Sequence, residues 1–157
     1  MFKDIKWVFF DVDGVLTDGR LYYSSAGEDY KVFNVKDGLG ILNLKALGIK
    51  VGIISGRGCE ALLRRLEELK IDEVLINRPD KANAFEDLRV KYGDEILNSV
   101  CVGDDLPDLE LFQKCRFGLA VSDAVTEVIE RADLVLERKG GYGAVREACD
   151  LICKENQ

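Results

Sequence analysis

Histidine is absent from this chain of 157 residues, and its absence excludes several kinds of catalytic site. A Ser-His-Asp triad, a Cys-His pair and every histidine-ligated metal site depend on the imidazole side chain. Any acid–base catalysis must therefore be carried out by carboxylates, lysine or tyrosine. Proline is also scarce, with only two residues, which argues against a flexible linker, so we expect residues 1–157 to form a single domain.

Long apolar runs and an excess of positive charge are also missing. No apolar stretch approaches the ~20 residues of a membrane-spanning helix, and neither terminus resembles a signal peptide, so we expect a cytoplasmic protein without a membrane partner. The formal net charge is −7 and the pI is about 4.8, which disfavours a nucleic-acid partner. An acidic protein can still bind a phosphate ester where a metal ion or local positive charge supplies the attraction.

The cysteines are odd in number and form no C-x-x-C pair. Free cysteines usually behave as small buried hydrophobic residues, and we expect this of all of them. They are Cys59, Cys101, Cys115, Cys149 and Cys153.

Strand-like apolar runs alternate with helical patterns along most of the chain. The strand-like runs cover residues 8–10, 51–54, 73–76, 99–102, 118–121 and 134–136. The helical patterns cover residues 38–47, 59–70, 79–92, 107–114, 123–131 and 142–154. This alternation predicts an α/β fold: a three-layer, Rossmann-like parallel sheet with helices on both faces.

One segment, at about residues 20–35, interrupts this alternation. Leu21-Tyr22-Tyr23 and Tyr30-Lys31-Val32-Phe33 flank a Ser-Ser-Ala-Gly turn, a pattern typical of a β-hairpin inserted after the first strand. Each arm carries aromatic or β-branched side chains that gain nothing from exposure to solvent. We therefore expect the hairpin to pack on another surface, for example that of a second subunit.

The first strand ends in two carboxylates. Val8, Phe9 and Phe10 form an apolar run, and Asp11 and then Asp13 follow it directly, before a glycine. In open α/β proteins the carboxyl ends of the strands form the edge of the sheet at which ligands bind. Two acidic groups this close repel each other unless a cation or a shared proton intervenes, so a metal ion is the first candidate. Asp-x-Asp-Gly also occurs in ordinary turns, so the octapeptide alone leaves both interpretations open.

Three further motifs follow later elements. Ser55-Gly56-Arg57 comes after the run 51–54 and is typical of either a phosphate-binding loop or a helix cap. Lys81 opens a helix, where positive charge is unfavourable, which indicates an anionic partner unless the side chain is simply solvated. Gly103-Asp104-Asp105, followed by Asp108, ends a second apolar strand in carboxylates.

Taken in this order, the four motifs resemble those of the haloacid dehalogenase superfamily, and the resemblance extends over essentially the whole chain. Many members carry a large cap domain. Here only the hairpin follows the first motif, and Ile76 leads almost directly to Lys81. Residues 11–19, 33–38 and 140–147 are similar to the capless 3-deoxy-D-manno-octulosonate 8-phosphate phosphatase family, which acts in lipopolysaccharide precursor synthesis.

That family is tetrameric, and the hairpins and C-terminal tails of neighbouring subunits complete its active sites. The resemblance therefore implies a homotetramer in which the hairpin at about 20–35 and a tail at about 138–157 contact a neighbouring subunit.

The resemblance also implies the chemistry, which is that of an Mg²⁺-dependent phosphomonoesterase that works through an aspartyl phosphate. Asp11 is then the nucleophile, while Asp13 protonates the leaving alcohol and later activates water. Mg²⁺ is held by the carboxylates of Asp11 and Asp104 and by the backbone carbonyl of Asp13.

The same resemblance implies a substrate-binding set. Ser55 bonds a phosphate oxygen, and Lys81 neutralises the phosphate and the nucleophile. Arg57 grips a carboxylate, which suits a small phosphorylated sugar acid as substrate. The complete set is Ser55, Gly56, Arg57 and Lys81. Asp108 supports the site by orienting either Lys81 or a metal-bound water, and Asp105 is either a supporting group or only a helix start.

Three alternatives remain open at this point. The same chemistry could serve a related substrate, such as the 9-phosphate of a nine-carbon sugar acid. A receiver-like module, which keeps its aspartyl phosphate, also has a parallel sheet and acidic strand ends, but Asp13 so close to Asp11 favours rapid hydrolysis. The third alternative is a catalytically silent oligomerisation scaffold, which the filled reactive positions disfavour.

Overall fold

The computed structural model describes residues 1–157, apart from the side chain of residue 29. Six parallel strands form one sheet in the order β5-β4-β1-β6-β7-β8, so β1 lies between β4 and β6. The strands are β1 (Trp7–Phe10), β4 (Lys50–Ile54), β5 (Glu73–Leu75), β6 (Ser99–Gly103), β7 (Phe117–Ala120) and β8 (Leu134–Val135). The predicted α/β fold is confirmed, and the predicted parallel sheet with it.

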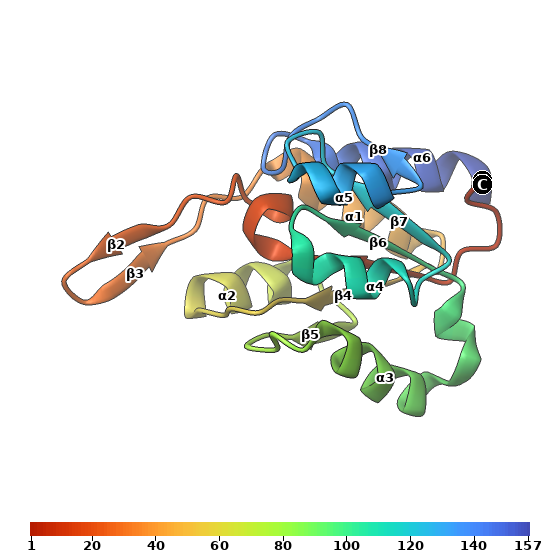
Figure 1. Cartoon of the computed structure of the whole chain (residues 1–157), viewed down its shortest axis with the longest axis horizontal. Helices are drawn as coiled ribbons and strands as arrows, with labels where there is room; N and C mark the ends of the chain where they lie inside the picture. Colours follow the sequence, from red (N-terminus) through yellow and green to blue (C-terminus); the bar gives the residue numbers. More distant parts are fainter.

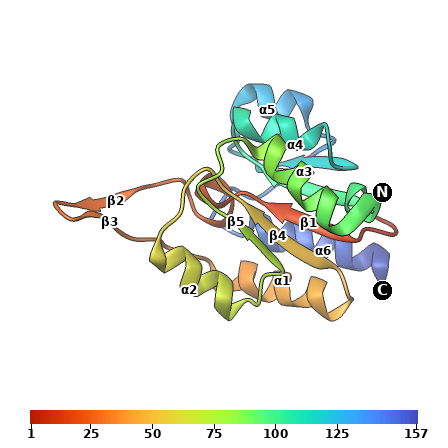
Figure 2. The same cartoon turned by 90° about the horizontal axis from the view of Figure 1, so that it is seen from below.

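Helices cover both faces of this sheet. They are α1 (Val35–Ala46), α2 (Glu60–Glu68), α3 (Lys81–Tyr92), α4 (Leu109–Phe112), α5 (Thr126–Arg131) and α6 (Ala144–Asn156). Figure 2 shows α3 and α4 on one side of the sheet and α1, α2 and α6 on the other. Short turns complete the chain: η1 (Val12–Leu16), η2 (Gly93–Leu97) and η3 (Leu106–Asp108). Predicted helix bounds differ from these by up to three residues, and the pattern at 107–114 divides into η3 and α4.

The core has two halves because successive side chains of a strand point to opposite faces. Val8 and Phe10 of β1 pack in a cluster with residues of α1, α2 and α6. Trp7 and Phe9 pack in a second cluster with residues of α3 and α4. All four side chains are fully buried or nearly so. The central strand is therefore fixed from both faces, and it holds whatever follows Phe10 rigidly in place.

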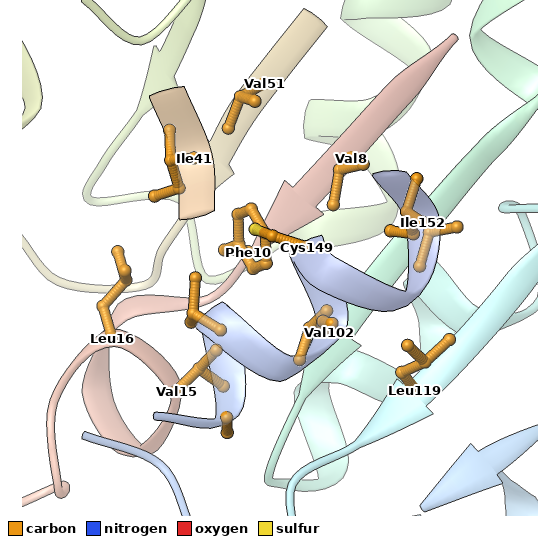
Figure 3. Close-up of a cluster of buried hydrophobic side chains, with 14 of the residues drawn as sticks. Val8, Phe10, Val15, Leu16, Ile41, Val51, Val102, Leu119, Cys149 and Ile152 are labelled. Carbon is orange, nitrogen blue, oxygen red and sulfur yellow. The ribbon is translucent and has the colours of Figure 1, made fainter. Parts of the chain in front are cut away.

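Helix α6 is part of this core. Figure 3 shows Cys149 and Ile152 of α6 directed toward Val8 and Phe10 of β1. Six of its residues are buried: Ala144, Val145, Ala148, Cys149, Ile152 and Cys153. The helix predicted at 142–154 is confirmed, and its apolar residues form one stripe that packs against their own chain. The contact of a tail at about 138–157 with a neighbouring subunit stays a prediction.

The predicted hairpin is present and projects away from the body of the molecule (Figure 1). Its strands are β2 (Tyr22–Ser24) and β3 (Gly27–Tyr30), and the rings of Tyr22 and Tyr30 stack at its base. Leu21, Tyr23 and Val32 are largely exposed. The hairpin thus presents apolar surface that its own chain leaves uncovered.

Two smaller expectations can be compared with the structure. All five cysteines are free; four are buried as expected, but Cys59 is only half-buried because it lies just before the first turn of α2. Among the described helices, none combines the length and the apolar character needed to cross a membrane.

Candidate active site

The motifs of three neighbouring strands meet at one edge of the sheet. Asp11 follows β1, Ser55 follows β4, and Asp104 follows β6. Since β1 lies between β4 and β6 and all three strands are parallel, their carboxyl ends bring these residues together. A cleft of about 240 Å³ opens there. Its lining includes Asp11, Asp13, Ser55, Gly56, Arg57, Lys81, Asp104 and Asp105.

Larger grooves of about 560 and 540 Å³ lie along α6, away from these side chains. Chemistry therefore identifies the candidate site better than volume does, because three titratable groups with strongly shifted pKa values line the smaller cleft, namely Asp11, Lys81 and Asp104.

Asp11 is held in a fixed orientation. Its Oδ1 accepts a hydrogen bond from the backbone N–H of Val12 at 2.7 Å, and its Oδ2 lies 3.1 Å from Nζ of Lys81. Burial, together with the negative charge of Asp108, raises the pKa of Asp11 to about 6, although Lys81 and the Val12 N–H act in the opposite direction. One oxygen of this carboxylate is thus anchored, while the other faces the cleft beside a cation.

Lys81 lies between two carboxylates. Its side chain is 4 % exposed, and its Nζ is 2.6 Å from Oδ1 of Asp108 as well as 3.1 Å from Asp11. Burial favours the neutral amine, but the charges of Asp108 and Asp11 outweigh it and raise the pKa of Lys81 above its ordinary value. The anionic partner predicted for Lys81 is therefore confirmed, and there are two of them.

Asp108 is fully engaged within the protein. Its Oδ1 accepts from Lys81, and its Oδ2 accepts from the backbone N–H groups of Asp104, at 2.9 Å, and Asp105, at 3.3 Å. The carboxylate thus joins the lysine to the loop after β6. Asp105 itself caps η3, with its Oδ1 accepting from the N–H of Leu106. Of the two roles left open for Asp105, the structure shows the helix start.

Asp104 is the carboxylate without an adequate partner. Its Oδ1 is buried and has no hydrogen bond within the described part of the chain. Burial and the charges of Asp11 and Asp108 raise the pKa of Asp104 to about 8. Carboxylate oxygens of Asp11, Asp104 and Asp108 all lie within 4.8 Å of one another. An orphaned oxygen in a set of hard oxygen donors fits a divalent cation such as Mg²⁺.

Gly14 makes this cluster sterically feasible. Its φ is +87°, a conformation that favours glycine, and a Cβ at this position would lie 1.9 Å from Oδ2 of Asp104. The loop that carries Asp13 can therefore approach the Asp104 carboxylate only without a side chain at residue 14.

Asp13 faces a different set of groups from Asp11. Its Oδ1 accepts a hydrogen bond from Nζ of Lys31 at 2.7 Å, and its Oδ2 lies 3.8 Å from Nε of Arg57. Lys31 also donates to Oε1 of Glu28 at 2.7 Å. Burial lowers the pKa of Lys31, but its hydrogen bonds to Asp13 and Glu28 more than offset this, so the pKa is raised. The two carboxylates of the first motif thus have separate partners.

Lys31 and Glu28 are not among the residues that the sequence motifs predict for the site. Both belong to the hairpin region, whose aromatic residues suggested a role in packing. Arg57 also contacts the hairpin, donating to the hydroxyl of Tyr23 at 2.9 Å. An Asp13 that needs a counter-charge was a usable signal, but the sequence offered many lysines to supply one.

Ser55 is buried, with its hydroxyl accepting from the N–H of Arg57 at 3.3 Å. Gly56 lies beside it, and both line the cleft. The hydroxyl remains able to donate a hydrogen bond into the cleft. The structure therefore brings together all the residues predicted for the site, and Asp105, which also lines the cleft, uses its side chain to cap η3.

Comparison with known proteins places these observations in a family. The family model for haloacid dehalogenase-like hydrolases matches residues 73–147. The 3-deoxy-D-manno-octulosonate 8-phosphate phosphatase of Haemophilus influenzae is 42 % identical over 150 residues, which cover 96 % of this chain and 83 % of that protein. The enzyme of the same name from Escherichia coli K12 is 41 % identical over 150 residues, covering 96 % of this chain and 80 % of that one.

Solved structures agree. The octulosonate 8-phosphate phosphatase from Moraxella catarrhalis, in complex with a magnesium ion, a phosphate ion and the sugar acid KDO, superposes with a TM-score of 0.93 at 40 % identity. The match covers 98 % of this chain and 88 % of that one. The cobalt-bound form of the Haemophilus influenzae phosphatase superposes with a TM-score of 0.92 at 41 % identity, over 98 % of this chain and 90 % of that one.

Proposed function

The chain belongs to the haloacid dehalogenase-like hydrolase family, alongside its 3-deoxy-D-manno-octulosonate 8-phosphate phosphatases, and we propose that Asp11, Asp13 and Lys81 carry out its reaction. The enzyme is a phosphatase that hydrolyses 3-deoxy-D-manno-octulosonate 8-phosphate to the free sugar acid and phosphate. One observation carries the proposal for the residues: the strand-end carboxylates Asp11 and Asp104 meet within 4.8 Å beside a buried lysine.

In the first step, a carboxylate oxygen of Asp11 forms a bond to phosphorus. The bond between phosphorus and the sugar oxygen breaks, and its electron pair stays on that oxygen, which takes a proton from Asp13. Lys81, 3.1 Å from the nucleophile, balances the negative charge that gathers around the phosphoryl group. The product of this step is an aspartyl phosphate with the sugar acid released.

In the second step, water attacks the aspartyl phosphate. Asp13, now ionised, takes a proton from the water while the new oxygen–phosphorus bond forms. The bond between phosphorus and Asp11 breaks, and the electron pair returns to the carboxylate. Because Asp13 lies two residues from Asp11 on the same loop, hydrolysis follows directly, which disfavours the receiver-like alternative.

The metal ligands in this proposal are the carboxylates of Asp11 and Asp104 and the backbone carbonyl of Asp13. Asp108 is left out because both of its oxygens already accept hydrogen bonds. A bound divalent cation would offset the charge repulsion between the nucleophile and the ester. We propose Mg²⁺ as this cation, supported by the oxygen-only donor set and by the magnesium in the Moraxella catarrhalis structure.

Substrate contacts complete the proposal. The Ser55 hydroxyl and the backbone around Gly56 bind phosphate oxygens, and Arg57 binds the carboxylate of the sugar acid with its guanidinium. We also propose that the protein assembles as a homotetramer through the exposed hairpin, whose side chains Leu21, Tyr23 and Val32 are uncovered in the single chain.

A panel of phosphorylated substrates tests the function, with released phosphate as the measurement. We expect the octulosonate 8-phosphate to have the highest kcat/KM, and the kcat/KM of neutral sugar phosphates to be at least tenfold lower. The Arg57→Lys variant should narrow that gap, because a lysine cannot make two parallel hydrogen bonds to a carboxylate. A preference for the 9-phosphate of a nine-carbon sugar acid would replace the substrate assignment but keep the chemistry.

A further inference from the structure

Lys31 lies directly after β3, at the base of the hairpin, and its ammonium is buried at the edge of the active site. The side chain is only 2 % exposed. Removing an ammonium group from water is costly unless it is paired, and Lys31 is paired with Asp13 and Glu28, both at 2.7 Å. The lysine reaches across 18 residues of sequence to contact one carboxylate of the first motif.

These groups close a ring of charges. Asp13 contacts Lys31, Lys31 contacts Glu28, Glu28 lies 3.4 Å from Arg57, and Arg57 lies 3.8 Å from Asp13. Two positive and two negative groups alternate around the ring. The position of Asp13 is therefore tied to the hairpin as well as to its own loop.

The ring treats the two oxygens of Asp13 differently. Lys31 donates a hydrogen bond to Oδ1. Among the described side chains, Oδ2 has only the 3.8 Å ion pair with Arg57, a separation too long for a hydrogen bond. The torsion that rotates an aspartate carboxylate is broad, so without Lys31 the carboxylate plane of Asp13 could turn away from the orientation that presents one oxygen to the cleft.

We propose that Lys31 is a positioning residue, which holds Oδ1 of Asp13 so that Oδ2 exchanges protons with the reacting oxygens. The proposal rests on the function proposed above. In the first step the leaving sugar oxygen, which keeps the electron pair of the broken bond to phosphorus, takes the proton from Oδ2. In the second step Oδ2 takes the proton of the attacking water. Lys31 itself exchanges no proton.

The test compares two leaving groups in the Lys31→Met variant, which keeps most of the apolar stem and removes the charge. The phenolate of p-nitrophenyl phosphate leaves without a proton, whereas the sugar oxygen needs one. We expect the first turnover of the octulosonate 8-phosphate, measured by rapid quench, to be at least tenfold slower than in wild type. With p-nitrophenyl phosphate, the rate of the first turnover should stay within threefold of wild type. It should appear as a burst of p-nitrophenolate, followed by slow hydrolysis of the aspartyl phosphate.

A general structural defect would slow both first turnovers in the same proportion, and that result, or no change in either, would overturn the proposal. The matched control is Lys45→Met, which removes a 2.7 Å ion pair with Asp72 at the opposite edge of the sheet and should leave both rates unchanged. If circular dichroism shows that Lys31→Met does not fold, Glu28→Gln serves instead. Glu28→Gln should slow the first turnover of the octulosonate 8-phosphate more than that of p-nitrophenyl phosphate, by a smaller factor than Lys31→Met. Equal slowing of the two substrates would refute the proposal. An inactive wild-type enzyme would instead refute the function.

Discussion

At the scale of single residues, the surroundings of Asp11 and Asp13 separate two groups that the sequence makes look alike. Asp11 faces Lys81 and the acidic cluster, while Asp13 faces Lys31 and Arg57. A nucleophile must be ionised, and a proton donor must be able to hold a proton, so one enzyme needs both environments. Lys81 favours the ionised form of Asp11, which supports the role of Asp11 as the nucleophile.

The Asp11→Asn variant tests the nucleophile. The amide has nearly the same volume and can still accept the hydrogen bond from the N–H of Val12, but its oxygen is a poor nucleophile. We expect kcat for the octulosonate 8-phosphate to fall at least 1000-fold while far-UV circular dichroism stays unchanged. Asp94→Asn, at a surface position, is the control. Retention of a tenth of wild-type turnover by Asp11→Asn would rule out the assignment.

The charge balance of the cluster predicts a metal dependence. The cluster contains three carboxylates, of Asp11, Asp104 and Asp108, and one ammonium group, of Lys81. When all four groups are ionised, the net charge of the cluster is −2. One divalent cation balances that charge. Asp104→Asn removes one of these charges at an oxygen without a partner. After both proteins are freed of metal with EDTA, Asp104→Asn should need at least ten times more Mg²⁺ than wild type for half-maximal activity. Isothermal titration with Mg²⁺ alone should show the same weakening, and an unchanged affinity would exclude Asp104 as a ligand.

At the scale of elements, helices α1 and α6 meet at a buried carboxylate. Asp37, in the first turn of α1, is 1 % exposed, and its Oδ1 accepts a hydrogen bond from the N–H of Arg146 in α6 at 2.9 Å. Its Oδ2 has no hydrogen-bond partner among the described residues. Burial raises the pKa of Asp37 to about 6, although the Arg146 N–H and the charges of Arg65 and Arg146 act against this. The junction thus favours the protonated acid.

This shift predicts a pH-dependent effect of Asp37→Asn on stability. Because the pKa is higher in the folded state than in the unfolded state, ionisation of Asp37 opposes folding, and its cost grows as the pH rises from about 4 to about 6. Asparagine keeps an acceptor for Arg146 and cannot ionise. The variant should gain roughly 1 to 3 kcal/mol relative to wild type at pH 7, and the gain should vanish below pH 4. Urea unfolding at both pH values measures it; a pH-independent difference would contradict the mechanism.

The sequence predicts the elements well and their long-range contacts less well. The strands around the site are short apolar runs of aromatic and β-branched residues, so the ends of β1, β4 and β6 could be located to within one residue. The buried position of Lys31 could not be located, because it depends on a hairpin folding back onto a loop 18 residues away. The helical pattern at 142–154 predicted α6, whereas the contact of the loop before α6 with the loop that carries Asp13 could not be predicted.

The glycines at 140–143 have a local purpose in the structure. A Cβ on Gly140 would lie 1.7 Å from the carbonyl oxygen of Gly14, and the N–H of Gly141 donates to the carbonyl of Val15 at 3.0 Å. The segment before α6 therefore lies directly against the loop that carries Asp13. Deleting residues 140–157 would remove the six buried residues of α6 along with this contact, so such a truncation tests the stability of the fold rather than any contact between subunits.

At the scale of the whole molecule, the hairpin is the surface best suited to assembly. It projects from the body of the molecule (Figure 1), and Leu21 and Val32 at its base are 43 % and 54 % exposed. The double variant Leu21→Ser/Val32→Ser removes apolar surface without touching the side chains of the charge ring. If the hairpin forms the subunit interface, light scattering after gel filtration should show wild type at the mass of four 17.5 kDa chains and the variant at a lower mass.

Val90→Ser is the matched control, because Val90 on α3 is 89 % exposed and lies away from the hairpin; it should keep the mass of wild type. A double variant that also keeps that mass would place the interface elsewhere, and a monomeric wild type would refute the tetramer. Activity separates assembly from chemistry. The ring of Asp13, Lys31, Glu28 and Arg57 lies within one chain, so a dissociated variant should still turn over p-nitrophenyl phosphate at close to the wild-type rate. A loss of that turnover on dissociation would mean that a neighbouring subunit supplies part of the site.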